Sequence, residues 1–156
     1  MPSSYEETET IGSDSPGDRT EAHERLPRAL SLKRRDHIRA LFDRERDDVH
    51  TRTEGCIRIL YRVIPRGEAG RDVPLQVGFS VPRRTGNAVV RNRIKRLMRE
   101  TFRRAQPPFL EALDPSDRTL TLMILFRGDA DRAEGSVEDD LRTALARIGR
   151  HLGIDM

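Results

Sequence analysis

The strongest periodic pattern in the chain lies between residues 88 and 105. Apolar side chains and one threonine recur there every three or four residues, at Val90, Ile94, Leu97, Met98, Thr101, Phe102 and Ala105. At about 100° per residue these positions form one stripe along a helix. The pattern therefore predicts an amphipathic helix that buries one side and ends at the QPPF sequence.

Three other segments have the apolar patterns of strands. Residues 56–64 alternate: Arg58 and Arg62 lie on one face, and the other face is made of Ile57, Ile59, Tyr61 and Val63. Residues 75–81 alternate in the same way, and residues 119–126 are largely apolar, as an interior strand is. The Gly and Pro residues of PRGEAGRDVP predict a hairpin between the first two strands.

Two further patterns predict helices near the two ends of this region. In LSLKRRDHIRALFDRE, Ile38, Leu41 and Phe42 lie on one face of a short helix. From Ser136, which resembles the start of a capping box, a second apolar stripe runs to residue 152. The polar DDVHTRTEG segment predicts a loop. The order of elements predicts a single α+β domain, with one sheet of about four strands and helices packed on it.

Charge is strongly segregated along the 156 residues, although the net charge is only +3. Residues 1–24 carry seven acids, one Arg and no apolar period, which predicts a disordered acidic tail before a domain of residues 25–156. Two interpretations of this tail stand: it mimics phosphate on the protein's own basic surface, or it is a solubilising extension. Residues 83–104 carry nine basic side chains and one acid, Glu100, which indicates a polyanionic partner.

The polar side of the 88–105 helix is the candidate binding surface. It is expected to present Arg91, Asn92, Arg93, Lys95, Arg96, Arg99, Arg103 and Arg104. Like charges one turn apart cost roughly 0.2–0.5 kcal/mol per pair, so a polyanion that relieves the repulsion is favoured over a merely solvated face. Arg83 and Arg84 extend this surface around the start of the helix, where free backbone N–H groups also favour phosphate.

Here the sequence resembles a known family. The run VGFSVPRRTGNAVVRNRIKRLMRETFRR (Val77–Arg104) is similar to the signature of the bacterial ribonuclease P protein family: a glycine-serine strand end, a basic pair, Gly-x-Ala-Val and a basic helix that opens with Arg-Asn-Arg. Weaker, collinear similarities are the first helix (Leu32–Phe42), Tyr61 and Arg127. The resemblance covers roughly residues 30–150.

The resemblance implies a fold and a set of roles. It implies a ribosomal protein S5 domain 2-like sheet with a left-handed βαβ crossover, an arrangement that pattern alone would not predict. The basic helix would bind the catalytic RNA of ribonuclease P, with one protein per RNA. A cleft between the first helix and the sheet would hold the single-stranded 5′ leader of precursor tRNA, and its expected residues are Arg34, Ile38, Phe42 and Tyr61. Ile38 stands where family members often have Phe.

The chain itself is not expected to be the nuclease. Its four histidines show neither metal-ligand spacing nor a nucleophile pattern. Asp129, Asp131 and the acids of residues 138–140 are more typical of loops and of a helix N-terminus than of a Mg²⁺ site. The scissile chemistry is expected in the RNA subunit, where Mg²⁺ would act as counter-ion and activate the attacking water. No metal is expected to be bound tightly by this chain.

Cysteine usage and hydropathy bear on the compartment. Cys56 is the single cysteine, which excludes an intramolecular disulfide and fits a reducing environment. The N-terminal residues are polar and acidic, unlike a signal peptide, and the longest apolar run has five residues, against about 20 for a membrane span. A cytoplasmic protein without a membrane partner is therefore expected.

Three other interpretations stay open at this point. The chain could be a different basic RNA-binding module, such as a ribosome-associated protein. It could be a nuclease that acts without RNA, or an interaction domain that is indifferent to RNA. RNA binding that weakens with salt would exclude the last of these.

Overall fold

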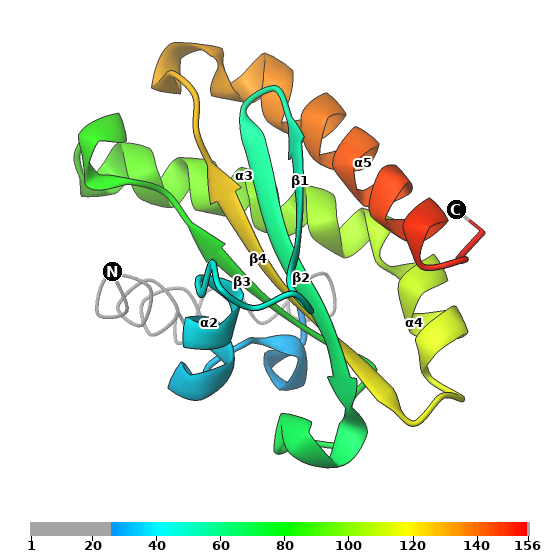
Figure 1. Cartoon of the computed structure of the whole chain (residues 1–156). Helices are drawn as coiled ribbons and strands as arrows, with labels where there is room; N and C mark the ends of the chain where they lie inside the picture. The colour runs from blue at the N-terminus through cyan, green and yellow to red at the C-terminus, as the bar shows by residue number, and fades with distance from the viewer. Residues whose placement is uncertain (1–25, 156) are drawn as a thin grey trace.

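A four-stranded sheet with helices on both faces makes up the computed structural model, which describes residues 26–155 (Figure 1). The strand order is β1-β2-β4-β3, and the strands are β1 (His50–Glu54), β2 (Ile57–Pro65), β3 (Leu75–Ser80) and β4 (Arg118–Phe126). β2 is antiparallel to both β1 and β4, whereas β3 is parallel to β4. The α+β class is confirmed. The expected acidic tail, residues 1–24, lies outside the described residues.

The hairpin in this sheet is not the predicted one. The polar segment expected to be a loop contains β1, which pairs with β2 through the turn at Gly55, where φ is +53°. β2 and β3 do not pair with each other, because β4 lies between them. The prediction of a hairpin between residues 56–64 and 75–81 was therefore wrong, and so was the loop assigned to β1.

The two faces of the sheet are covered unequally. Helices α3 (Ala88–Ala105) and α5 (Ala133–His151) cover one face and enclose the main core, which includes Ile59, Val77 and Phe102. On the other face, the short helix α2 (Arg35–Leu41) encloses a smaller cluster of Leu32, Leu41, Leu60 and Met123. We call this second side of the sheet the α2 face. Because α2 has only seven residues, part of the α2 face stays uncovered (Figure 1).

The connection from β3 to β4 has the rare handedness. In Figure 1 both strands run toward the upper left, β3 lies to the left of β4, and α3 passes behind the sheet. A crossover in this direction is left-handed, as the resemblance implied, whereas about 98% of such connections are right-handed. It also includes α4 (Pro107–Leu113), whose Phe109 completes the main core.

Helix boundaries differ from the predicted ones at two places. The QPPF sequence ends α3 as predicted, but its prolines occupy the first turn of α4, where a missing N–H costs nothing. α5 begins at Ala133, one turn before Ser136, so the expected capping box is inside the helix and does not form the N-cap. None of the described helices combines the length and the apolar composition needed to cross a membrane.

Candidate nucleic-acid interface

Helix α3 forms the basic surface that the sequence predicted. Its N-cap is Asn87, whose side-chain oxygen accepts a hydrogen bond of 3.0 Å from the backbone N–H of Val90. Ile94, Met98 and Phe102 face the sheet and are at most 1% exposed. On the opposite side, Arg93 and Arg96 are exposed to solvent. Partly exposed positions beside them are Arg91, Asn92, Arg99 and Arg103.

Lys95 does not lie on this surface. It is only 3% exposed, which corrects the expectation that it projects beside Arg96. α3 packs on the sheet and also against α5, so the buried arc of the helix is wider than the apolar stripe. Arg99, one turn after Lys95, marks the side that faces β3: its guanidinium carbon lies 5.6 Å from the centroid of the Phe79 ring. Lys95 lies on the same side of α3 as Arg99.

The C-terminal turn of α3 contains ion pairs to Glu100. Arg103 and Arg104 both bond to Glu100, with shortest distances of 2.6 Å and 3.2 Å. The hydrogen bond from Arg103 holds the pKa of the Glu100 carboxyl below its ordinary value. Elsewhere on this surface, four exposed arginines have no ion pair with a carboxylate of the described residues: Arg83, Arg84, Arg93 and Arg96. We call these four side chains the arginine surface.

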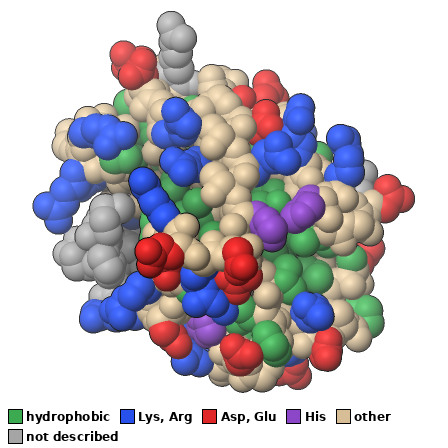
Figure 2. Space-filling model, in the orientation of Figure 1, with side chains coloured by type: hydrophobic (Ala, Val, Ile, Leu, Met, Phe, Trp, Pro, Cys, Tyr) green, Lys and Arg blue, Asp and Glu red, His purple; other side chains and the backbone are tan. Residues whose placement is uncertain are grey.

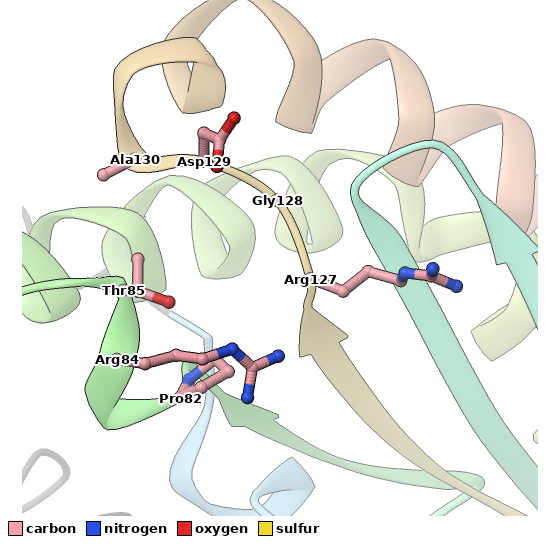
Figure 3. A pocket seen from close by; sticks show the side chains of 7 residues that line it. All are labelled: Pro82, Arg84, Thr85, Arg127, Gly128, Asp129 and Ala130. Carbon is pink, nitrogen blue, oxygen red and sulfur yellow. The ribbon is translucent and has the colours of Figure 1, made fainter.

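A polar pocket adjoins the start of α3, where the parallel strands β3 and β4 end. Its volume is about 410 Å³, and it is lined by Pro82, Arg84, Thr85, Arg127, Gly128, Asp129 and Ala130. Arg84 extends from the turn η4 (Arg83–Thr85) toward the end of β4, and the Arg127 guanidinium points away from Arg84, across β2 (Figure 3). Arg127 was noticed in the sequence only as a family similarity. That similarity was to an arginine at the end of the last strand, and the structure places Arg127 directly after β4.

The expected cleft residues do not all meet. Phe42 ends α2 and is 48% exposed, while Ile38 packs in the smaller cluster beside Leu60. Tyr61 lies on the other face of the sheet, against α5, where it is 2% exposed and its hydroxyl lies 2.9 Å from Nδ1 of His151. Neighbouring residues of a strand point to opposite faces, so Leu60 and Tyr61 cannot both face α2. Burial raises the pKa of the Tyr61 hydroxyl.

Arg34 lies at the beginning of α2, with a local carboxylate partner. Its guanidinium pairs with Asp36 at 2.7 Å and donates to the backbone carbonyl of Glu68 at 3.3 Å. These contacts hold the Arg34 side chain beside the turn that follows β2. The exposed guanidinium of Arg34 can therefore contact a ligand near α2, but its charge is partly neutralised by Asp36.

The α2 face also carries groups other than the expected cleft residues. Arg58 is exposed and Leu125 is half-buried, and the two are direct neighbours across β2 and β4. Arg62, on the same face, pairs with Asp48 at 2.8 Å. Basic, acidic and apolar side chains are interspersed on this side of the protein (Figure 2). The alternation of β2 in the sequence had already separated Arg58 and Arg62 from Tyr61.

The acids of α5 and the Cys56 thiol, which are candidates for metal binding or catalysis by residue type, have contacts within the fold. The Asp140 carboxylate accepts a hydrogen bond of 2.9 Å from the backbone N–H of Cys56, and Glu138 pairs with Arg142 at 3.2 Å. Burial raises the pKa of the Cys56 thiol to about 12, so it is protonated at neutral pH. Within residues 26–155, no three His, Cys, Asp or Glu side chains are grouped so that they could hold a metal ion.

Comparisons with known proteins agree with this geometry. The sequence model of the Ribonuclease P family matches residues 26–149. The ribonuclease P protein component of Desulfovibrio desulfuricans is 35% identical over 127 residues, which cover 81% of this chain and 88% of the relative. That of Mycolicibacterium vanbaalenii is 37% identical over 95 residues, 61% of this chain and 73% of the relative.

A solved structure supports the fold. A Staphylococcus aureus RNase P protein, a mutant described as defective in mRNA degradation activity, superposes with a TM-score of 0.50 at 17% identity. The match covers 81% of this chain and 91% of the other. With most of the described residues matched by the family, the chain belongs to the ribonuclease P protein family and is a protein component of that tRNA-processing endoribonuclease.

Proposed function

We propose that the arginine surface binds the catalytic RNA of ribonuclease P, with one protein per RNA. The observation that carries this proposal is the group of exposed arginines at α3 and η4 that have no carboxylate partner within residues 26–155. A guanidinium offers a planar set of donors that fits phosphate oxygens. If about four phosphates are neutralised, affinity falls with salt with a slope near −3 on logarithmic axes.

The α2 face is proposed to hold the 5′ leader of precursor tRNA. Phe42 offers an exposed ring on which a base can stack, and Arg58 is available for phosphates on the same side of the sheet. The pocket with Arg84 and Arg127 lies at the ends of β3 and β4, next to the start of α3. A strand of RNA that follows the α2 face would therefore lead toward the RNA bound at the arginine surface.

The bond-breaking step is assigned to the RNA subunit. Mg²⁺ is proposed to be held there, because RNA phosphates supply the oxygen ligands that this ion prefers. The contribution of the protein is placement of the substrate and neutralisation of charge. We place this work in the cytoplasm, where bacterial precursor tRNA is made.

Reconstitution tests the proposed function. Purified full-length protein, added to a cognate ribonuclease P RNA and precursor tRNA, is expected to restore cleavage at Mg²⁺ concentrations at which the RNA alone is inactive. The protein without RNA is expected to leave the substrate intact. Cleavage by the protein alone would place the chemistry in this chain, and an RNA activity that the protein does not change would contradict the assignment.

Phe42→Ala tests the leader site. The variant is expected to bind precursor tRNA at least about fivefold more weakly, because stacking on a base contributes about 1–3 kcal/mol. Binding of mature tRNA, which has no leader, is expected to stay the same. The measurement is the ratio of the two dissociation constants in the reconstituted complex.

Val89→Ala is the matched control, since Val89 is the other large apolar side chain that is exposed among residues 26–155, at 74%. This change is expected to leave the ratio of precursor to mature tRNA affinity unaltered. If Phe42→Ala weakens both ligands equally, Phe42 is not a leader contact.

A further inference from the structure

The N-terminal segment has the charge opposite to that of the arginine surface. Residues 1–24 contain seven acids and one Arg, and so carry a net charge of −6. Residues 83–104, which contain the arginine surface, carry a net charge of +8. The two segments belong to one polypeptide, and opposite charges attract over about 10 Å at 0.1 M salt. Charge complementarity alone makes them candidates for contact.

The chain enters the fold beside α3. Leu26 packs against the main core that α3 closes, and Leu30 is buried in it at 6% exposure. Ser31 then pairs with Val77 along the outer edge of β3, and Leu32 joins the smaller cluster under α2. The described chain thus passes from the α3 side of β3 to the α2 side. The described chain therefore begins on the side of the sheet where α3 lies.

The length of the segment is sufficient to reach the whole surface. Twenty-four residues can span at most about 80 Å, at roughly 3.3–3.6 Å per residue. The 18-residue helix α3 is about 27 Å long, at 1.5 Å per residue. A short tether gives an effective local concentration of the order of millimolar, so even a weak contact within the chain is populated.

We propose that residues 1–24 bind the arginine surface within the same molecule and compete there with RNA. The proposal rests on the proposed RNA-binding role of that surface. Any RNA must displace the acidic segment before it can bind the arginine surface. An RNA that makes few contacts with this surface gains too little binding free energy to offset that displacement. An RNA that fits the whole surface gains enough. The segment would therefore suppress non-specific RNA binding more than cognate binding.

Two variants of the full chain with equal net charge test the proposal. In the first, four acids of the segment are replaced by glutamine: Glu6, Glu7, Glu9 and Glu21. In the second, four exposed acids far from the segment in sequence are replaced by their amides: Glu45, Asp47, Glu111 and Asp117. The probe is a double-stranded RNA unrelated to tRNA. Both variants gain the same long-range attraction for RNA, so a difference between them reports on contact by the segment.

The first variant is expected to bind the probe roughly three- to tenfold more tightly than the second at low ionic strength, where charges are least screened. Its affinity should also fall more steeply with salt, because no intramolecular anion replaces the RNA as it leaves. Equal affinities and equal slopes for the two variants would overturn the proposal.

A measurement without RNA separates this proposal from the proposed function. Backbone amide chemical shifts of α3 are expected to change between the intact protein and the first variant, and to stay constant in the second. Unchanged α3 shifts in both would overturn the intramolecular contact. This readout does not depend on ribonuclease P RNA, so a failed reconstitution would count against the proposed function alone.

Discussion

Replacing both Arg93 and Arg96 by Ala is expected to weaken binding of ribonuclease P RNA by about 10- to 100-fold at low salt. Hydrogen bonds to charged groups contribute roughly 1.5–3 kcal/mol each, and part of that is recovered by water and by the neighbouring arginines. Both side chains are exposed, without a carboxylate partner among the described residues. Folding should be unaffected within about 0.5 kcal/mol, as for ordinary surface substitutions.

The salt dependence distinguishes lost contacts from a general loss of charge. Two fewer phosphate contacts should reduce the logarithmic slope of affinity against salt by about 1.5. Arg71 and Arg150 are the matched controls, because both are exposed and lie outside α3 and η4. Their double replacement by Ala removes the same charge and is expected to change RNA affinity much less. Equal losses for the two pairs would mean that only net charge matters, and that α3 is not the RNA contact.

Residue alternation along β2 predicted more of the site than the family resemblance did. The pattern placed Tyr61 with Ile57 and Ile59 on the buried side, and the structure confirms that placement. The resemblance assigned Tyr61 to the cleft, although the cleft side of β2 is the side of Leu60 and Arg58. The two-residue period of a strand is a geometric constraint, whereas a similarity of residue type at one position is not.

Elements that depend on tertiary contacts were the ones that the sequence did not predict. β1 has a polar sequence because it is an edge strand: four of its five residues alternate between exposed and half-buried, and its single neighbour is β2. The placement of β4 between β2 and β3 is a long-range pairing, for which the segment between residues 65 and 75 carries no signal. Short-range turn residues therefore favoured a hairpin that does not form.

Lys95 shows the same limit within a helix. The apolar stripe predicts the direction of the buried side, but not its width, which depends on how many neighbours the helix has. α3 contacts α5 as well as the sheet, and Lys95, on the same side of the helix as Arg99, is buried. At about 100° per residue, Arg96 lies opposite the apolar stripe, whereas Arg93 and Lys95 lie about equally far from its centre, on its two flanks. The periodicity therefore predicts the exposure of Arg96, whereas the exposure of Arg93 and the burial of Lys95 depend on tertiary contacts.

Phe102→Ala is expected to lower the free energy of unfolding by about 3–5 kcal/mol, which is a large share of the stability of an ordinary domain. Phe102 is 0% exposed and packs edge-to-face on Phe79, with ring centroids 6.1 Å apart, so its ring holds α3 on β3. Leu97→Ala, at a half-buried position of the same helix, should cost clearly less. Denaturant unfolding measures both changes, and equal losses would contradict the packing described for α3.

Phe102→Ala also tests whether the packing of the core affects stability without affecting the affinity for RNA. Phe102 does not reach the surface, so folded Phe102→Ala molecules should keep the arginine surface. A ligand that binds only the folded state raises apparent stability in proportion to the logarithm of its concentration over its dissociation constant. Saturating RNA should therefore raise the melting temperature of Phe102→Ala strongly, and that of the Arg93 and Arg96 double variant weakly. The opposite order would mean that Phe102 shapes the RNA contact itself.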